Sequence, residues 1–436
     1  METKRRYRTA DQSWVRQRNL AILMNYLWSA GGVIARSQLT EISGLNKTTV
    51  GNLLELLESW NFIREVGYSE SQNGRPSILV EINPDGGRII GVEIGVGFVS
   101  IVKTNMQGTP VCSKVIRTNS QGLSLKKLSP ELVLNEAERV IREVIEKDAR
   151  DGEHLLGIGV GVPGLVDSKT GTLLFAPNLH WVDLPIKKRF SEQFNTHVIV
   201  ENEANAAALG EWMLGCVRQE ENFIYLSAGV GLGGGCFING HLYRGAEGFA
   251  GEVGHVTLDP NGPFCNCGNR GCWETFIGPN SIIQQVQQII IKNQDADLLL
   301  HCGGDIDNLN IEGIIKAAEN GIPVIQEVFK DVGRYLGIGI SNLTNAFNPK
   351  YVVLGGVLSL AGPYILPTAL EEIDKRAFPH AKKRVEVKVS AFKFDACVRG
   401  SATLILSKLI NNPWGWKPES IVDNQRKSQH FVENLI

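Results

Sequence analysis

The chain has 436 residues, enough for two or three domains and too many for one ordinary hydrophobic core. Hydrophobic residues form 43% of it and the formal net charge is −2, which is typical of a soluble globular protein and means that any polyanion site must be a local patch. The basic start at 4–8 leads into polar sequence, and no run approaches the roughly 20 apolar residues that cross a membrane. The composition therefore argues against a signal peptide and a membrane span, and it predicts a cytoplasmic protein.

The first region, at 13–83, follows a basic arm at 1–12 and has the pattern of a small helical domain. Apolar side chains recur at helical spacing in its first part; they are Val15, Ile22, Leu23, Tyr26 and Leu27. The sequence then predicts a short helix over 36–43, a turn at Gly44 and a second helix over 47–60. Two helices joined by a short turn that contains glycine are typical of a helix-turn-helix.

The second helix of this pair has the features of a recognition helix. Asn46 is its predicted N-cap, because an asparagine side chain accepts hydrogen bonds from the free N–H groups at a helix start. Its predicted buried stripe consists of Val50, Leu53, Leu54 and Leu57. The side chains left outside at its start are Lys47, Thr48, Thr49 and Asn52. Since the start of a recognition helix meets base edges and phosphates, these four are the predicted DNA contacts.

The alternating run FIREVGYSESQNGRPSILVEIN, at 62–83, predicts two strands with a loop between them, a wing with Arg75 at its tip. The alternative is a helical packing module with a polar face and no nucleic acid. Arg16 and Arg18, together with the basic arm, favour DNA binding, because cations beside such a motif suit phosphate contacts.

Two later regions repeat one pattern of strands and glycine turns. The run at 88–118 predicts three strands joined by turns, and the run FIYLSAGVGLGGGCFINGHLYRG at 223–245 predicts a similar hairpin. Helices are expected at 132–146, 311–320 and 324–347. The run KYVVLGGVLSLAG, at 350–362, is expected to be a buried strand that ends in glycines. The repetition predicts two related α/β lobes with a cleft between them.

Three of the eight cysteines, Cys265, Cys267 and Cys272, lie within eight residues, and His255 precedes them. Zinc takes four nitrogen or sulfur ligands in tetrahedral geometry, and three cysteines with one histidine are a common closed set. The turn GNRG before the last cysteine lets the chain curl back to one metal ion. The alternative is a glycine-rich loop whose cysteines are merely small and apolar. Because thiols stay reduced in the cytoplasm, the cluster predicts a structural zinc site.

Four stretches, GLNKTTV, ENEANAAALGE, HLYRGAEGFAGEVGH and CNCGNRGCWE, resemble the ROK family of repressors, open reading frames and sugar kinases. The resemblance covers nearly the whole chain, and the sequences of these four stretches are most similar to those of the family's xylose-responsive repressors. It implies an α/β protein with an N-terminal winged helix-turn-helix and a two-lobed actin-like ATPase body of the ribonuclease-H-like class. The implied divisions are a basic arm at 1–12, the winged helix-turn-helix at 13–83, lobe 1 at 84–202 completed by about 399–412, lobe 2 with the zinc loop at 203–398, and a polar tail at 413–436.

The same resemblance implies a sugar site. The family's Asn-Asp pair falls on Asn202 and Glu203, its Glu-x-x-His on Glu252 and His255, and the glutamate after the last cysteine on Glu274. Carboxylates and a carboxamide can bond several vicinal hydroxyl groups. The zinc would hold the loop that presents the two later glutamates. For each acid alone, the alternative is a solvated loop carboxylate.

The resemblance also marks departures from the family's kinases. Where those enzymes resemble Asp-x-Gly-Gly-Thr this chain has EIGVG at 93–97, and where they resemble Gly-Thr-Gly-x-Gly-Gly-Gly it has GVGLGGG at 229–235. Val96 and Val230 cannot donate to a phosphate oxygen. Glu203 is one methylene longer than the family's catalytic aspartate, and a displacement near 1 Å can cost about 100-fold in rate. We therefore expect no catalytic residues.

Together these features predict a sugar-responsive DNA-binding transcriptional repressor of carbohydrate utilisation genes, with xylose or glucose as effector. The expected partners are operator DNA, a monosaccharide, zinc and a second copy of the chain, as a homodimer or tetramer. Dimerisation is expected because two recognition helices need half-sites about 34–36 Å apart, or multiples of that. The alternatives are a sugar kinase with a DNA-binding appendage and a zinc-stabilised scaffold with neither activity.

Overall fold

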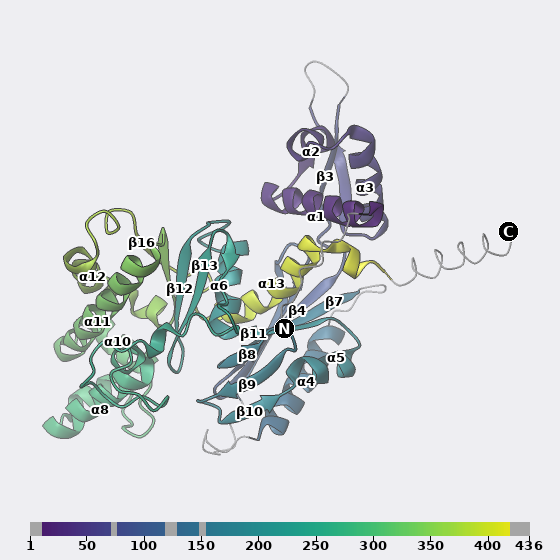
Figure 1. Ribbon diagram of the computed structural model, residues 1–436. Coiled ribbons are helices and arrows are strands. Elements are labelled where there is room, and N and C mark those ends of the chain that lie inside the picture. Colours follow the sequence, from purple (N-terminus) through teal and green to yellow (C-terminus); the bar gives the residue numbers. More distant parts are fainter. Residues whose placement is uncertain (1–10, 71–75, 118–128, 148–153, 419–436) are drawn as a thin grey trace, which may run out of the picture.

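The computed structural model describes residues 11–70, 76–117, 129–147 and 154–418 (Figure 1). The predicted DNA contact Arg75, nearly all of the basic arm and the end of the polar tail lie outside these described residues. Among the helices that the structure describes, none is both long and apolar enough to cross a membrane.

Residues 12–82 form a small unit, here called the N-terminal module, at one end of the molecule (Figure 1). Its elements are α1 (Gln12–Ala30), β1 (Ile34–Ala35), α2 (Arg36–Ser43), α3 (Lys47–Ser59), β2 (Ile63–Tyr68) and β3 (Ile78–Ile82), with strand order β1-β3-β2. The predicted α3 start is confirmed, because the side chain of Asn46 accepts a hydrogen bond from the backbone N–H of Thr49. Val15, which fits the helical spacing of α1, is exposed, so the buried stripe of α1 begins at Leu20.

Lobe 1 is built on a five-stranded sheet of order β11-β7-β4-β5-β6. The strands are β4 (Arg88–Gly95), β5 (Phe98–Asn105), β6 (Pro110–Arg117), β7 (Leu155–Val162) and β11 (Val198–Asn202). The first three are antiparallel, and β7 and β11 run parallel to β4. Helices α4 (Pro130–Glu146) and α5 (Ile186–Phe194) share one apolar core with this sheet. A small sheet of β8 (Leu165–Asp167), β9 (Thr172–Ala176) and β10 (Trp181–Leu184) adjoins it.

Lobe 2 repeats this strand order, which is β14-β13-β12-β15-β16. The strands are β12 (Phe223–Ala228), β13 (Leu232–Ile238), β14 (His241–Leu242), β15 (Tyr351–Gly356) and β16 (Glu386–Val389). Three are again antiparallel and two run parallel to the first. The helices are α7 (Glu274–Ile277), α8 (Pro279–Asn293), α9 (Ala296–His301), α10 (Ile311–Glu319), α11 (Pro323–Phe347) and α12 (Val357–Arg376). The two sheets therefore have the same topology, as expected from the repeated pattern.

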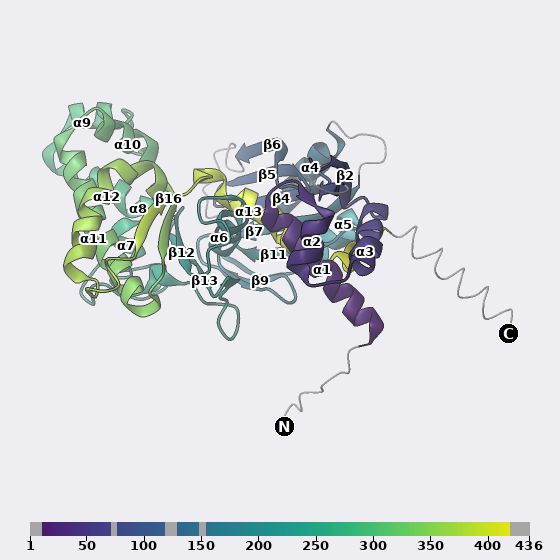
Figure 2. The same ribbon diagram turned by 90° about the horizontal axis from the view of Figure 1, so that it is seen from above.

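Helices α6 (Glu203–Leu214) and α13 (Ala396–Asn411) lie between the two sheets (Figure 2). Glycines allow their close approach: a Cβ added at Gly159 of β7 would lie 1.8 Å from the carbonyl oxygen of Ser401 on α13. At Gly235 of β13, a Cβ would lie 2.6 Å from the Cβ of Ala208 on α6. Each sheet is thus covered by one of two helices that also pack on each other.

Two expectations are wrong in detail. The expected strand at 350–362 ends at Gly356, and α12 begins at Val357, because Gly356 turns the chain with a positive φ of 58°. Residues 413–436 are not a polar tail throughout, because Pro413–Trp416 form the 3-10 helix η4 and pack against the N-terminal module.

Candidate effector site and metal centre

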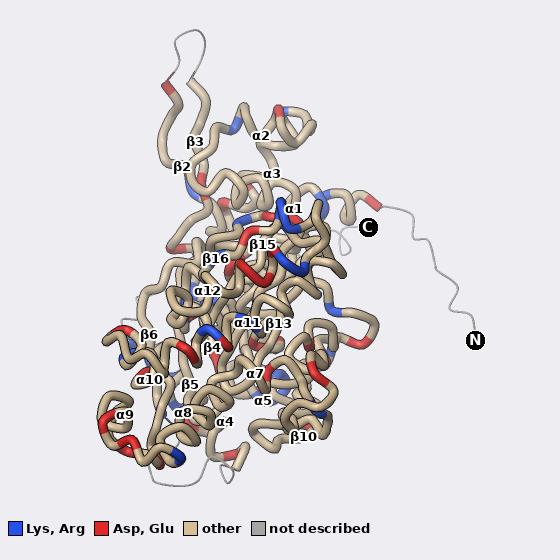
Figure 3. The backbone as a smooth tube through the Cα atoms, turned by 90° about the vertical axis from the view of Figure 1, so that its left-hand side faces the viewer, with Lys and Arg blue, Asp and Glu red and all other residues tan. Residues whose placement is uncertain are grey.

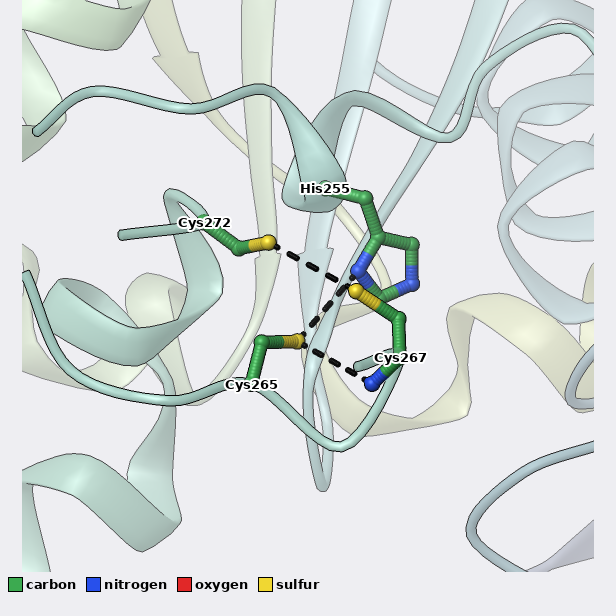
Figure 4. Close-up of side chains that lie close together, drawn as sticks. All are labelled: His255, Cys265, Cys267 and Cys272. Atoms are coloured by element: carbon green, nitrogen blue, oxygen red, sulfur yellow. Dashed lines mark hydrogen bonds between the residues drawn. The ribbon is translucent and has the colours of Figure 1, made fainter. Parts of the chain in front are cut away.

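The four predicted metal ligands lie together in the loop region after β14 (Figure 4). His255 ends the 3-10 helix η2 (Val253–His255), and Cys272 lies just before α7. The ligand atoms of His255, Cys265, Cys267 and Cys272 all lie within 4.8 Å of one another. Gly271 permits this turn, because a Cβ there would lie 1.6 Å from the carbonyl oxygen of Asp259.

The spacing of these atoms fits a tetrahedral ion. The Sγ of Cys265 lies 3.6 Å from the Nδ1 of His255, and the Sγ atoms of Cys267 and Cys272 are 3.7 Å apart. Tetrahedral zinc with bonds of about 2.0–2.3 Å separates neighbouring ligand atoms by roughly 3.5–3.8 Å. All eight cysteines are free thiols, and 3.7 Å is far longer than the ~2.05 Å of a disulfide. The group can therefore hold a metal ion.

All five predicted sugar-binding residues line one cavity of about 270 Å³; they are Asn202, Glu203, Glu252, His255 and Glu274. They come from both lobes, because the first two lie at the junction of β11 and α6 and the other three lie beside the metal group. Ligand pockets are usually about 300–1,000 Å³, so this cavity has the size for a small ligand.

Asn202 has a structural task within the cavity. Its Oδ1 accepts hydrogen bonds from the backbone N–H groups of Ala204 and Asn205, at 2.9 and 3.2 Å, and so caps α6. Its Nδ2 donates to the carbonyl oxygen of Gly164 at 3.0 Å. One amide N–H of Asn202 is left for a ligand, because its other polar positions are already used within the protein.

The metal group adjoins the cavity: His255 and Cys267 belong to both, and Glu274 of the cavity contacts the ligand Cys265. The Oε1 of Glu274 accepts from the Sγ of Cys265 at 2.9 Å, and its Oε2 accepts from the backbone N–H of Leu232 at 3.3 Å. His255 presents Nδ1 to Cys265, whereas its Nε2 lies 3.9 Å from Glu252. A metal on Nδ1 would leave the Nε2 proton directed toward the cavity.

The loop that carries Glu252 is also anchored at its start. Arg244 places its guanidinium nitrogens 2.7 and 2.9 Å from the Oε2 of Glu201, which is buried at the end of β11. The loop is thus held to lobe 1 at Arg244 and to the metal group at His255. A buried carboxylate needs such a partner, so this ion pair fixes the loop across the two lobes.

Acidic side chains dominate the charge of the cavity. Burial, and then the charge of Glu252, raise the pKa of Glu203 to about 7. Burial also raises the pKa of Glu252, against a lowering by His255. With a pKa of about 7, Glu203 is partly protonated near neutral pH, and a carboxyl group can donate to a hydroxyl group when protonated and accept from one when ionised.

Sequence reasoning missed two polar residues of the cavity, Asn178 and Asn266. Asn178 lies between β9 and β10, outside every motif, so nothing in the sequence marked it. Asn266 stands between two cysteines and could have been recognised as part of the metal loop.

A second cavity of about 370 Å³ lies beside the first and shares Glu203 with it. Val96 and Val230 line it, as expected for the altered glycine turns, together with Glu93 and Asp395. Burial, and then repulsion from Glu203 and Asp395, raise the pKa of Glu93 to about 8. Wherever these carboxyl groups are ionised, their negative charge opposes the binding of phosphate groups.

The predicted DNA-contact residues on α3 face outward. Lys47, Thr48 and Asn52 are exposed and Thr49 is half-buried, whereas the stripe of Val50, Leu53, Leu54 and Leu57 is buried. Strands β2 and β3 project from the end of the module, away from both lobes (Figure 3). The start of α3 is therefore free to meet a partner.

The fold and the site define a two-lobed α/β body, with four candidate metal ligands in one loop region, joined to a small N-terminal module. The family model described as the ROK family matches residues 104–408, and the chain belongs to the ROK family. The chain is 33% identical over 402 residues to the xylose repressor of Bacillus spizizenii, covering 92% of this chain and 98% of that protein.

Two similar solved structures differ in how much of this chain they cover. A ROK family transcriptional regulator, a homologue of the Escherichia coli MLC protein, matches with a TM-score of 0.78 and 26% identity, covering 91% of this chain and 97% of that chain. A ROK glucokinase from Streptomyces griseus, in complex with glucose and AMPPNP, matches with a TM-score of 0.64 and 28% identity. It covers 73% of this chain and 99% of its own. The regulator thus matches the module as well as the body.

Proposed function

We propose that this protein is a sugar-responsive, DNA-binding transcriptional repressor of carbohydrate utilisation genes, with xylose as the first candidate effector and glucose as the second. The observation that carries the proposal is the contrast between the two cavities. One gathers five hydrogen-bonding residues of both lobes, and the other has valines and acidic groups where a kinase needs phosphate contacts. The similarity to xylose repressors over most of the chain supports it.

Zinc is the proposed ion of the metal group. Three thiolates and one imidazole are a preferred zinc set, and a closed set of four leaves no position for catalysis. The ion would require Cys265 as a thiolate, which cannot donate to Glu274. That carboxylate oxygen would then be available to a sugar hydroxyl, so zinc would prepare the site as well as hold the loop.

The N-terminal module is proposed to be a winged helix-turn-helix that binds operator DNA. Helix α3 would enter the major groove with Lys47, Thr48, Thr49 and Asn52, and Arg75 would reach phosphate or the minor groove. A homodimer, or a tetramer made from two such dimers, would place two α3 helices on the two half-sites of an operator.

A sugar would act by a shift between two arrangements of the lobes. Its ligands come from both lobes, so it binds a closed arrangement better than an open one. The effect on operator affinity equals the effect of operator on sugar affinity, as binding linkage requires.

A sugar kinase with a DNA-binding appendage is the second candidate, and one observation favours it. Glu203 lines both cavities, and a pKa of about 7 suits a general base near neutral pH. A base placed between the two cavities could take a proton from a sugar hydroxyl. The altered phosphate contacts make this the weaker candidate.

Calorimetric titration with D-xylose, D-glucose and N-acetylglucosamine, beside an ATP-turnover assay with the same sugars, tests the proposal. A repressor binds one sugar without consuming ATP, and its affinity for a selected DNA duplex changes when that sugar is added. Sugar-dependent ATP consumption would support the kinase instead. The absence of both sugar and DNA binding would leave only a scaffold.

A further inference from the structure

The N-terminal module and lobe 1 share one hydrophobic core. Leu20 and Leu27 of α1 belong to the same cluster of buried side chains as Ile405 and Leu409 of α13. On the outer side of this joint the Nδ2 of Asn25 lies 3.4 Å from the Oδ1 of Asn411, which ends α13. The module therefore rests directly on α13 and not on a free linker (Figure 1).

The 3-10 helix η4, which follows α13, lies between the N-terminal module and lobe 1. The ring of Trp414 packs edge-on against Trp60, which follows α3, with 5.6 Å between ring centroids. Trp416 points to the other side, where its Nε1 donates to the carbonyl oxygen of Leu156 at 3.0 Å and its ring lies 4.7 Å from His197. The two tryptophans thus connect the N-terminal module to lobe 1.

The opposite end of α13 reaches the effector region. Ala396 and Cys397, at its start, line the second cavity beside Glu203. Along its length α13 packs on α6, where a Cβ added at Gly210 would lie 2.8 Å from the Cα of Gly400. Helix α6 begins with Glu203 and is capped by Asn202, both in the sugar cavity. A displacement of α6 would therefore be transmitted to α13 by contact.

The joint has room to rearrange. A cavity of about 160 Å³ lies between the end of α1 and lobe 1, lined by Trp28, Ile82, Leu214 and Arg218. The indole N–H groups of Trp28 and Trp60 are buried and have no hydrogen-bond partner among the described residues. An unsatisfied buried donor is unfavourable, so a second arrangement that pairs these groups would compete with this one. Contacts with two such arrangements would amplify small shifts.

We propose that α13 and η4 are the element that carries the sugar signal to the N-terminal module, and that Trp414 is the residue that positions the recognition helix. The inference rests on the proposed function and adds the route between its two sites. Sugar closure moves α6 and α13 together, α13 moves η4, and Trp414 turns the module through Trp60.

The test compares full-length wild type, Trp414→Ala and Trp414→Phe. A duplex selected by the wild-type protein from a random-sequence pool serves as DNA, and D-xylose or D-glucose, whichever binds, serves as sugar. Fluorescence anisotropy gives the operator affinity with and without saturating sugar, and calorimetry gives the sugar affinity alone. The allosteric factor is the ratio of the operator affinities measured with and without sugar, and such factors are commonly about 5–150-fold. Trp414→Ala should reduce this ratio to less than about 2-fold. Its sugar affinity should stay within about 3-fold of wild type, because Trp414 is outside the sugar cavity, whereas a general loss of structure would also reduce the sugar affinity.

Trp414→Phe keeps an edge-on ring and should retain most of the factor. Phe194→Ala is the matched control, because it removes another edge-on aromatic pair, Phe190–Phe194 at 6.1 Å, on α5 away from the joint. It should leave the factor intact. An unchanged factor in Trp414→Ala would overturn the inference and leave the proposed repressor function standing. A wild-type factor of one would overturn both. If Trp414→Ala binds DNA too weakly to measure, Asn411→Ala is judged by the same criterion.

Discussion

The carboxylate of Glu274 lies 2.9 Å from the Sγ of Cys265 and also lines the cavity of about 270 Å³ between the lobes. This side chain of the proposed effector site thus contacts a ligand of the metal group. We therefore expect a change in the metal group to alter the effector site, and this relationship can be tested from either side.

Replacing a metal ligand should reduce sugar binding as well as metal content. We expect about one zinc per chain in protein purified without added metal, and less in Cys267→Ser, because zinc needs all four ligands. Mass spectrometry of the metal and calorimetry with sugar measure the two effects. Cys112→Ser is the control, since Cys112 is half-buried on β6 and outside the metal group. Full zinc occupancy in the single variants of Cys265, Cys267 and Cys272 would disprove the assignment.

Neutralising one cavity glutamate should weaken sugar binding without affecting DNA binding. A hydrogen bond to a charged group contributes about 1.5–3 kcal/mol, so Glu252→Gln should raise the dissociation constant of the sugar roughly 10–100-fold. Calorimetry measures this value, and anisotropy measures the operator affinity without sugar. Glu247→Gln is a matched control in the same loop, because Glu247 is exposed and outside the cavity. Equal losses in the two variants would indicate a general effect on the loop.

Two replacements in the N-terminal module should affect DNA binding in different ways. Asn52→Ala should cost about 1–3 kcal/mol and relax the sequence preference at one operator position, because a base contact is lost. Arg75→Ala should weaken all sequences alike and lower the salt slope by about one, because a phosphate contact is lost. Lys292→Ala, an exposed residue of α8 in lobe 2, should change neither quantity. DNA affinities that did not change in either module variant would contradict the assignment of α3 and the wing.

ATP turnover should show no dependence on sugar. Val96 and Val230 offer no hydroxyl to phosphate, and Glu93 and Asp395 face the same cavity. Phosphoryl transfer depends on positioning and charge stabilisation, so the loss of these contacts should abolish turnover before it abolishes sugar binding. A coupled assay measures the rate, with a ROK glucokinase as positive control. Sugar-dependent turnover at about 1–100 per second would identify a kinase.

Stability should decrease as pH rises toward 8. The pKa of Glu93 is raised from 4.5 to about 8, so the folded state holds more protons than the unfolded state between these values. The stabilisation is full below pH 4.5 and is lost as pH rises through 8, by a few kcal/mol at about 1.4 kcal/mol per pH unit. Melting temperatures across pH 5–9 measure it. Glu93→Gln should make this profile less steep, leaving the part due to Glu203, whose pKa is also raised, whereas the exposed-residue variant Glu247→Gln should not change it. Parallel profiles for wild type and Glu93→Gln would refute the assignment.

The local parts of the structure could be predicted from sequence because local rules govern them. Asn46 caps α3 as expected, and the buried stripe from Val50 to Leu57 follows helical spacing. The cysteine spacing brought the metal group together, because a short loop has few ways to place four ligands. The family resemblance placed the five cavity residues, which lie far apart in the chain.

The parts that were missed depend on contacts between distant segments. The sequence at 350–362 is apolar throughout, so periodicity alone could not show that a strand ends and α12 begins at Val357. Trp414 stands in a polar stretch, and only its contact with Trp60, far away in the sequence, reveals its place. Asn178 likewise reaches the cavity through the packing of β9 and β10.

The core shared by α1 and α13 has a practical consequence for protein engineering. Regulators are often recombined by exchanging the DNA-binding part at a sequence boundary, here near residue 83. Such a chimaera would leave Leu409 and Trp414 facing a foreign surface, because their partners in α1 and at Trp60 would be removed. A working hybrid should instead transplant residues 12–82 together with 396–416, so that the transferred DNA-binding module keeps the surface of α13 and η4 on which it packs.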